Sequence, residues 1–336
     1  MRGFSMDELC GAMGNLVSKQ AISKYEKGKM LPNSTVLIQL ANVLKVSVDY
    51  FFRPFQIQLE GIEFRKKTKL PQKGVAQIKE VVRDMVERYL EIESILNINS
   101  DFIPILGNTI VRNGEDVKSL AERLRNVWKV GEDPVVNIVE LLEENKVKVI
   151  EIEAPSSFDG LSSFVSENWP VIVLNKQFLP ERKRFTALHE LGHLLLNIDP
   201  VLSHSEKEHL CNKFASEILI PESVFINLIG SNRKDIALKE LVDVQCQYGI
   251  SIDALMHKAK DLNIITESRY KIFYIKKNSS SNFRVAVEKS RFPEECSSRF
   301  ERLVYRALAS EIISFSKASV LLKQPVHQLK ESLNLV

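Results

Sequence analysis

Residues 186–197, TALHELGHLLLN, decide the fold of the central region. Within them HELGH, residues 189–193, has the pattern His-Glu-x-x-His inside an otherwise apolar run. In a helix, positions i and i+4 lie one above the other on the same face, so the imidazoles of His189 and His193 can both reach one metal ion. Glu190 directly follows the first histidine and can take a proton from a water molecule on that ion. The stretch predicts a buried helix that carries part of a metal site.

Two histidines do not complete a zinc site, because a catalytic zinc keeps three protein ligands and one open position for water. The next stretch, residues 205–221, has apolar residues at helical spacing and is stopped by Pro221, which predicts a second amphipathic helix. Its pattern favours a core position for Cys211 and a surface position for His209. The residues alone leave five candidates for the third ligand: His204, Glu208, His209, Cys211 and Glu217.

Gly192 is unusual inside such a helix. Glycine costs roughly 1 kcal/mol against alanine at a helical position. We therefore expect another segment to pass closely over the metal site at Gly192.

The composition limits the class of protein. A chain of 336 residues exceeds one typical core, so two or three domains are expected. The 4 cysteines form no Cys-x-x-Cys pair and indicate reduced thiols of a cytoplasmic protein. No apolar run is long enough for a membrane span and no signal peptide is recognisable, so no membrane partner is expected. A net charge of +3 is too weak to indicate nucleic acid on its own.

The first fifty residues predict several short helices. Ser5 and Glu8 form a capping-box pattern that opens a helix ending near Met13. Further helices are expected over residues 19–25 and 35–44, the latter after a turn at Pro32. Short helices, tight turns and a polar, basic middle helix are what a helix-turn-helix DNA reader needs, because its second helix places side chains in the major groove.

Residues 17–29, VSKQAISKYEKGK, followed by Pro32, resemble the recognition-helix region of XRE/Cro-type repressor domains. In that family another helix precedes the segment that begins here at Ser5, so the first helix of the domain is expected to be missing here. Either it is truncated, or the start codon is misplaced, or another segment supplies the missing surface. A purely architectural helical domain is the alternative. The resemblance implies that Gln can pair with adenine and Lys can reach guanine or phosphate. It implies four DNA-facing side chains: Lys19, Gln20, Ser23 and Lys24.

A connector follows the helix-turn-helix region. Residues 62–67, IEFRKK, with Lys69 and Lys73, form a basic run that suits a solvated edge or a phosphate contact. Residues 74–96 predict a long amphipathic helix, because their apolar side chains recur at helical spacing. This helix could be a spacer or the seam of a homodimer.

The catalytic region is expected to begin near Asp116. Helices are predicted over residues 116–128 and 136–145, and strands over 147–153, 160–165 and 169–174. Zinc peptidases often bind the backbone of a substrate along a strand beside the metal helix. Two segments could serve in this way: 161–165 and 171–175. The alternative is that both are ordinary strands of the sheet.

The region from residue 116 to 221 resembles the ImmA/IrrE family of metallopeptidases. The matching residues are RFTALHELGH at 184–193, Glu208 with CNKFA at 211–215, and LIP at 219–221. The resemblance selects Glu208 as the third ligand. It implies that His189, His193 and Glu208 bind zinc and that Glu190 is the general acid/base. It implies a structural or outer-shell role for Asn212.

The same resemblance implies a regulatory role. Members of the ImmA/IrrE family relieve repression by cutting a repressor, in stress responses and mobile elements, and fusion to a helix-turn-helix domain is a known arrangement. A protein substrate and DNA are therefore the expected partners. Glu190 favours catalysis, since a structural zinc site has no use for a base at this position. The alternatives are a DNA-binding regulator with a sensory or structural zinc site and an antitoxin-like protein that binds without cutting.

The sequence after Pro221 predicts mostly helices, over residues 233–248, 254–262 and 300–315, with a further helical pair within 316–333. A strand is expected at 269–276, RYKIFYIK, and a loop at 277–282. Three residues are candidates for steadying the oxyanion: His204, His209 and Tyr248.

The fold class that the sequence predicts is mainly α with a small β-sheet (α+β). Four parts are expected. They are a helix-turn-helix domain at 1–53, a basic linker with a connector helix at 54–115, a metallopeptidase domain at 116–264 and a C-terminal extension at 265–336.

Overall fold

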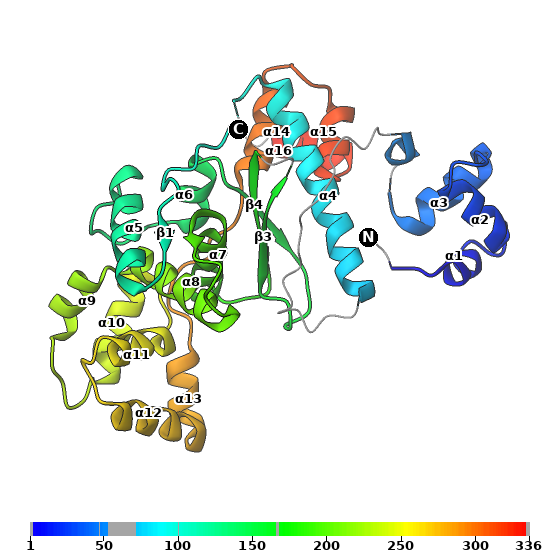
Figure 1. Ribbon diagram of the computed structural model, residues 1–336. Helices are drawn as coiled ribbons and strands as arrows, with labels where there is room; N and C mark the ends of the chain where they lie inside the picture. Colours follow the sequence, from blue (N-terminus) through cyan, green and yellow to red (C-terminus); the bar gives the residue numbers. More distant parts are fainter. Residues whose placement is uncertain (1–2, 47, 53–71, 100, 166–167, 334–336) are drawn as a thin grey trace. The chain divides into compact units, whose positions relative to one another are not determined.

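The computed structural model describes residues 3–46, 48–52, 72–99, 101–165 and 168–333, and the basic run at 62–67 with Lys69 lies outside them. The fold is mainly helical, with two small sheets among the described residues, which confirms the predicted fold class (Figure 1). The chain divides into two compact units. Among the described residues, the first consists of 3–46, 48–52, 72–98 and 300–333, and the second of 99, 101–165 and 168–299. The four-part division that the sequence suggests cuts the chain at other positions and stays a prediction.

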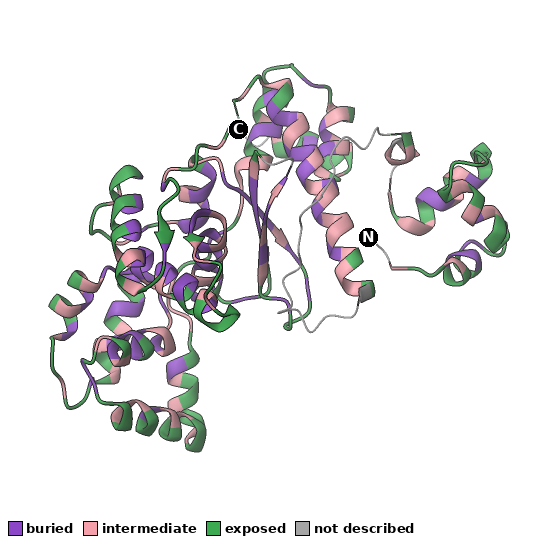
Figure 2. Cartoon of the chain, viewed as in Figure 1, coloured by how far each residue is buried: buried purple, intermediate pink, exposed green. Residues whose placement is uncertain are grey.

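The N-terminal part of the first unit holds three short helices and a 3-10 turn: α1 (Met6–Ala12), α2 (Lys19–Glu26), α3 (Ser34–Leu44) and η1 (Val48–Phe52). Each α-helix begins at a side-chain cap that satisfies an otherwise unbonded backbone N–H, from Ser5, Ser18 and Asn33 respectively. Few residues of these helices are buried (Figure 2). A small core joins them: Leu9, Cys10, Met13, Ile22, Val36 and Leu40.

The long helix α4 (Gln72–Ile95) packs against the end of the chain. Its buried Tyr89 and Ile92 share a core with α14 (Arg299–Ala309), α15 (Phe315–Leu322) and α16 (Val326–Leu333). The C-terminal helices therefore cover part of the apolar stripe of α4. The expected helix over 300–315 ends earlier, at Ala309, because Glu311 adopts a positive φ of 56° and ends the helical path.

The second unit is built on a three-stranded sheet with strand order β2-β4-β3. The strands are β2 (Lys148–Ile152), β3 (Gly160–Val165) and β4 (Trp169–Asn175). The central strand β4 is parallel to β2 and antiparallel to β3. Its residues from Pro170 to Asn175 are all buried, as expected for a strand paired on both edges. A second sheet that the sequence did not predict pairs β1 (Ile110–Val111) with β5 (Asn197–Ile198).

Four helices complete the core around this sheet: α5 (Gly114–Val127), α6 (Ile138–Glu144), α7 (Pro180–Leu195) and α8 (His204–Leu219). Helix α7 packs against β3, β4 and α8, so it lies between the sheet and the second amphipathic helix (Figure 1). Buried side chains from all four helices and the sheet form one continuous core.

Buried ion pairs fix the start of α7. The guanidinium of Arg184 is fully buried, pairs with Glu295 and donates to the carbonyl oxygens of Val135 and Tyr248. Next to it, Lys183 pairs with Glu151 on β2 at 3.0 Å. Buried charges are tolerated only when they are paired and hydrogen-bonded. These contacts therefore hold α7 in one orientation against the sheet and the segment around Glu295.

The remaining helices of the second unit are α9 (Glu222–Ile229), α10 (Leu238–Tyr248), α11 (Ile252–Asp261), α12 (Glu267–Ser279) and α13 (Ser281–Glu288). The strand predicted at 269–276 is wrong, because these residues belong to α12. Thr266 caps that helix, and Tyr270, Phe273 and Tyr274 face the core at helical spacing, which overrides their β propensity. The predicted loop at 277–282 is also wrong, since α12 continues to Ser279 and Ser280 caps α13.

Among the residues described, no helix combines the length and the apolar character needed to cross a bilayer.

Candidate metal centre

Helix α7 presents the two histidines. Pro180 occupies its first turn, where a missing N–H costs nothing, and the helix runs without interruption past His193. His189 and His193 lie one turn apart, with their ring centroids 4.7 Å from each other. His189 is 8% exposed, so its imidazole has left bulk water.

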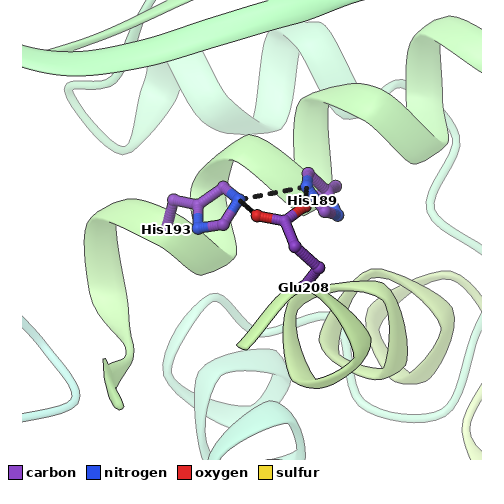
Figure 3. Close-up of side chains that lie close together, drawn as sticks. All are labelled: His189, His193 and Glu208. Atoms are coloured by element: carbon purple, nitrogen blue, oxygen red, sulfur yellow. Dashed lines mark hydrogen bonds and ion pairs between the residues drawn. The ribbon is translucent and has the colours of Figure 1, made fainter. Parts of the chain in front are cut away.

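Helix α8 brings Glu208 to the same point. Ser203 and Glu206 form a capping box that starts α8 one turn before Glu208. Figure 3 shows the Glu208 carboxylate pointing from α8 toward both imidazoles of α7. His189 Nε2 and His193 Nε2 lie 3.1 Å apart, and the Glu208 oxygens lie 3.4 Å from the first and 3.3 Å from the second. The structure therefore brings together the three side chains that the sequence analysis had grouped.

The spacing of these atoms fits one tetrahedral zinc ion. Ligand atoms about 2.1 Å from such an ion are held roughly 3.4 Å from one another. The three observed separations of 3.1, 3.3 and 3.4 Å are close to that value. Two imidazoles and one carboxylate are also the donor set of a common class of catalytic zinc site.

Hydrogen bonds on the outer side of the cluster select the tautomer that a metal needs. Asn212 Oδ1 lies 2.8 Å from His189 Nδ1 and can only accept, so this nitrogen carries the proton. Nε2 of His189 then presents its lone pair to the cluster. His193 Nδ1 has a contact of 3.2 Å with Cys211 Sγ. The outer-shell role expected for Asn212 agrees with this geometry.

Gly192 lies where α8 crosses α7. A methyl group at this position would meet Phe214 Cδ1 at 3.3 Å and the Cα atom of Cys211 at 3.4 Å. The segment expected to pass closely over the site is therefore α8. A larger side chain would push α8, and with it Glu208, away from the histidines.

Glu190 is held by the sheet. Ser162 Oγ on β3 donates a hydrogen bond of 2.7 Å to Glu190 Oε2. Gly160, on the same face of β3, allows α7 to pack closely on this strand. A methyl group at Gly160 would lie 2.8 Å from Thr186 Cγ2 and 2.9 Å from the carbonyl oxygen of Val173. Ser162 was not among the residues that the sequence pointed to. The alternation of β3 was its only signal, since Gly160 and Ser162 point to one face of a strand.

The strand order decides between the two segments proposed to bind a substrate backbone. Residues 171–175 lie in β4, which pairs with β2 on one edge and β3 on the other. That alternative is therefore wrong, because neither edge of β4 can accept a further strand. Residues 161–165 lie in β3, at the end of the strand order of the described sheet.

The three oxyanion candidates lie in different surroundings. His204 is exposed, and its Nδ1 lies 3.9 Å from Glu208 Oε1, beside the cluster. His209 is exposed on α8 and lines a cavity of about 850 Å³ together with Asn212. Tyr248 is buried at the end of α10, and burial raises the pKa of its hydroxyl. His204 thus lies close to one of the three clustered side chains.

The four residues expected to face DNA lie on α2. Lys19, Gln20 and Lys24 are exposed and Ser23 is partly buried, whereas Ile22 packs in the core. Lys19 Nζ pairs with Asp7 at 2.6 Å. A phosphate would therefore compete with Asp7 for this ammonium group.

Two parts of the chain match families of known proteins. Residues 1–51 match the family described as helix-turn-helix, and residues 142–260 match the family described as the IrrE N-terminal-like domain. The chain therefore combines a helix-turn-helix domain with an IrrE-like domain. Both predicted resemblances are confirmed. The matched IrrE-like region contains the whole His189, His193 and Glu208 cluster.

Two curated relatives match a short stretch of this chain. The radiation response metalloproteases IrrE of Deinococcus radiodurans and Deinococcus deserti are each 41% identical to this chain over 71 residues. The aligned stretch covers 18% of this chain, and 22% and 25% of the two relatives. The similarity thus concerns one part of each protein and does not extend to their full lengths.

Proposed function

We propose that this protein is a zinc-dependent endopeptidase that cleaves a repressor-type protein, and that its helix-turn-helix domain binds DNA. The observation that carries the proposal is the position of Glu190. It directly follows His189 on α7, and its carboxylate is held by Ser162 beside a cluster that fits zinc. A site that only stabilised the fold would have no use for an oriented carboxylate there.

His189, His193 and Glu208 would hold the zinc ion. Bound zinc would supply Lewis acidity, which polarises the scissile carbonyl and makes a neighbouring water more acidic. The carboxylate of Glu190 accepts the proton of the attacking water and then passes it to the nitrogen of the leaving amine. Ser162 fixes the orientation of that carboxylate through Oε2.

Two further groups fit the binding of a peptide. Strand β3 can pair with an extended substrate backbone along its outer edge, which would bring the substrate next to Glu190. His204, beside Glu208, is our candidate for donating a hydrogen bond to the developing oxyanion.

The substrate class follows from the pairing of domains. A protease fused to a helix-turn-helix domain can be brought to DNA sites where repressors act. The named function of the two relatives, radiation response metalloprotease, supports a regulatory role in a stress response. The remaining alternative is a DNA-binding or antitoxin-like protein whose zinc site is sensory or structural.

The test is co-expression of this protein with each repressor-like protein encoded near its gene, followed by mass analysis of the fragments. We expect one repressor to be cut at a defined bond, the cut to disappear in a zinc chelator, and added zinc to restore it. Intact repressors in every pairing with zinc-loaded protein would refute the endopeptidase and leave the alternative.

A further inference from the structure

Two consecutive residues of α8 contact the outer nitrogens of both histidines. Asn212 Oδ1 lies 2.8 Å from Nδ1 of His189, and Cys211 Sγ lies 3.2 Å from Nδ1 of His193. An amide oxygen is an ordinary partner for a metal-binding histidine. A thiol in that place is not, and it is the feature that calls for an explanation.

The position of Cys211 is fixed by the crossing of the two helices. It lies about one turn after Glu208 on α8, and its Cα atom faces Gly192 across the crossing. The side chain is fully buried. Asn212, in contrast, is exposed and lines a cavity. Water in that cavity can compete with His189 for hydrogen bonds to the Asn212 amide. No such competition reaches the buried sulfur.

The direction of the hydrogen bond follows from the cluster. Nε2 of His193 lies 3.1 Å from Nε2 of His189 and 3.3 Å from Oε1 of Glu208. When Nε2 presents its lone pair to a cation there, Nδ1 of the neutral ring carries the proton. The sulfur is then the acceptor.

We propose that Cys211 is a positioning residue of the zinc site. Its Sγ accepts the hydrogen bond from His193 Nδ1, which fixes the tautomer and the rotation of the ring, and the thiol does not itself bind the ion. This inference rests on the proposed zinc site but not on peptide cleavage, so zinc affinity tests it without any substrate.

Cys211→Ala and Cys211→Ser distinguish a role in positioning His193 from a role in packing the core. In a buried apolar site, alanine should be tolerated better than serine, because serine buries a hydroxyl. For zinc affinity the order should reverse, and the serine variant should bind zinc more tightly than the alanine variant. Serine keeps a hydrogen-bond acceptor for His193 Nδ1, and alanine does not. Loss of an outer-shell partner typically weakens metal binding by about 10- to 100-fold, and we expect the low end for a thiol, which is a weak acceptor.

The experiment is a chelator competition that measures zinc affinity for the full-length protein and its variants. We expect Cys211→Ala to bind zinc roughly tenfold more weakly, and Cys211→Ser to stay within about threefold of the parent. Cys211→Ser should nevertheless unfold at a lower temperature than Cys211→Ala. Replacement of the exposed Cys246 by alanine is the matched control and should change neither quantity. Asn212→Ala is the positive control and should weaken zinc binding.

The absorption spectrum of the Co²⁺-substituted protein gives a second readout. Rotation of the His193 ring should shift the visible bands in Cys211→Ala and leave them nearly unchanged in Cys211→Ser. Equal zinc affinity of the alanine variant and the parent would overturn the proposal, as would loss of a sulfur-to-cobalt charge-transfer band on substitution, which would make Cys211 a ligand. A parent that binds zinc but cuts no repressor would refute the proposed function and leave this inference standing. A parent that binds no zinc would refute both.

Discussion

The cluster of His189, His193 and Glu208 and the exposed surface of α2 differ in how firmly their side chains are held. At the cluster, His189 and Glu208 are both 8% exposed, and hydrogen bonds from α8 and β3 hold His189 and the adjacent Glu190. On α2, the side chains expected to reach DNA are mostly exposed, and Lys19 pairs with another exposed side chain, Asp7. Neighbouring elements therefore hold the cluster side chains in place, whereas the α2 side chains are mostly open to solvent.

This difference predicts how each region responds to substitution. Removing one group from a preorganised cluster should cost a large factor, because the other groups cannot rearrange to replace it. Removing one exposed lysine should cost little, because neighbouring side chains and ions compensate. The predictions below run from the largest expected effect to the smallest.

Glu190→Gln should lower the rate of repressor cleavage by about a thousandfold, because general acid–base groups contribute roughly 10²–10⁴ in rate. Zinc affinity should stay near that of the parent, since Glu190 is not one of the three clustered ligands. Kinetics of fragment formation and a chelator competition measure the two quantities. Unchanged cleavage would remove Glu190 from the mechanism, and unchanged regulation in cells would favour a sensory or structural zinc site.

Glu208→Gln should weaken zinc binding by more than about 100-fold, since losing a charged ligand exceeds the roughly 10- to 100-fold cost of an outer-shell partner. The rise in melting temperature that zinc gives the parent should shrink accordingly. Thermal unfolding with increasing zinc measures this. The matched control is Glu122→Gln, an exposed carboxylate on α5, and it should keep the full zinc response. The same response in Glu208→Gln would show that the carboxylate is not a ligand.

Ser162→Ala should lower kcat for repressor cleavage by about 10- to 100-fold and leave KM nearly unchanged, because hydrogen bonds to charged groups contribute roughly 1.5–3 kcal/mol. Ser163→Ala is the matched control and should leave kcat nearly unchanged. Ser163 is the next residue of β3, points to the other face of the strand and is buried there. A KM effect without a kcat effect would mean that Ser162 serves substrate binding and does not orient Glu190.

Lys24→Ala should weaken DNA binding only a few-fold and lower the slope of log K against log salt by about one. Lys19→Ala should have a smaller effect, because the ammonium of Lys19 already pairs with Asp7. Fluorescence anisotropy with a labelled fragment from upstream of the protein's own gene, at several salt concentrations, measures both. Asp7→Asn removes the carboxylate that pairs with Lys19 and should tighten DNA binding. No binding by the parent at low salt would end the DNA-binding proposal.

Local patterns allowed most of the helices and the cluster to be predicted. The spacing of His189 and His193 depends only on helix geometry, and capping residues such as Ser5 act within one turn. The choice of Glu208 came from family resemblance, because five residues near α8 had suitable chemistry. Contacts between distant segments escaped prediction. Ser162 meets Glu190 only because β3 packs on α7, and the β1–β5 pair joins segments far apart in the chain.

Two errors share a physical cause. The segment at 269–276 is rich in β-branched and aromatic residues, yet it forms helix because three aromatic side chains pack on the core at helical spacing. Residues 171–175 looked suited to bind a peptide, but their strand is paired on both edges. Both outcomes depend on tertiary packing, which a local pattern does not contain.

X-ray absorption at the zinc edge tests the central claim most directly. For the zinc-loaded protein we expect one ion per chain, bound by nitrogen and oxygen atoms at about 2.0–2.1 Å, with the scattering pattern of two imidazoles and no sulfur at about 2.3 Å. A sulfur neighbour would place Cys211 on the metal. A single imidazole, or none, would contradict the assignment of His189, His193 and Glu208 to one zinc ion.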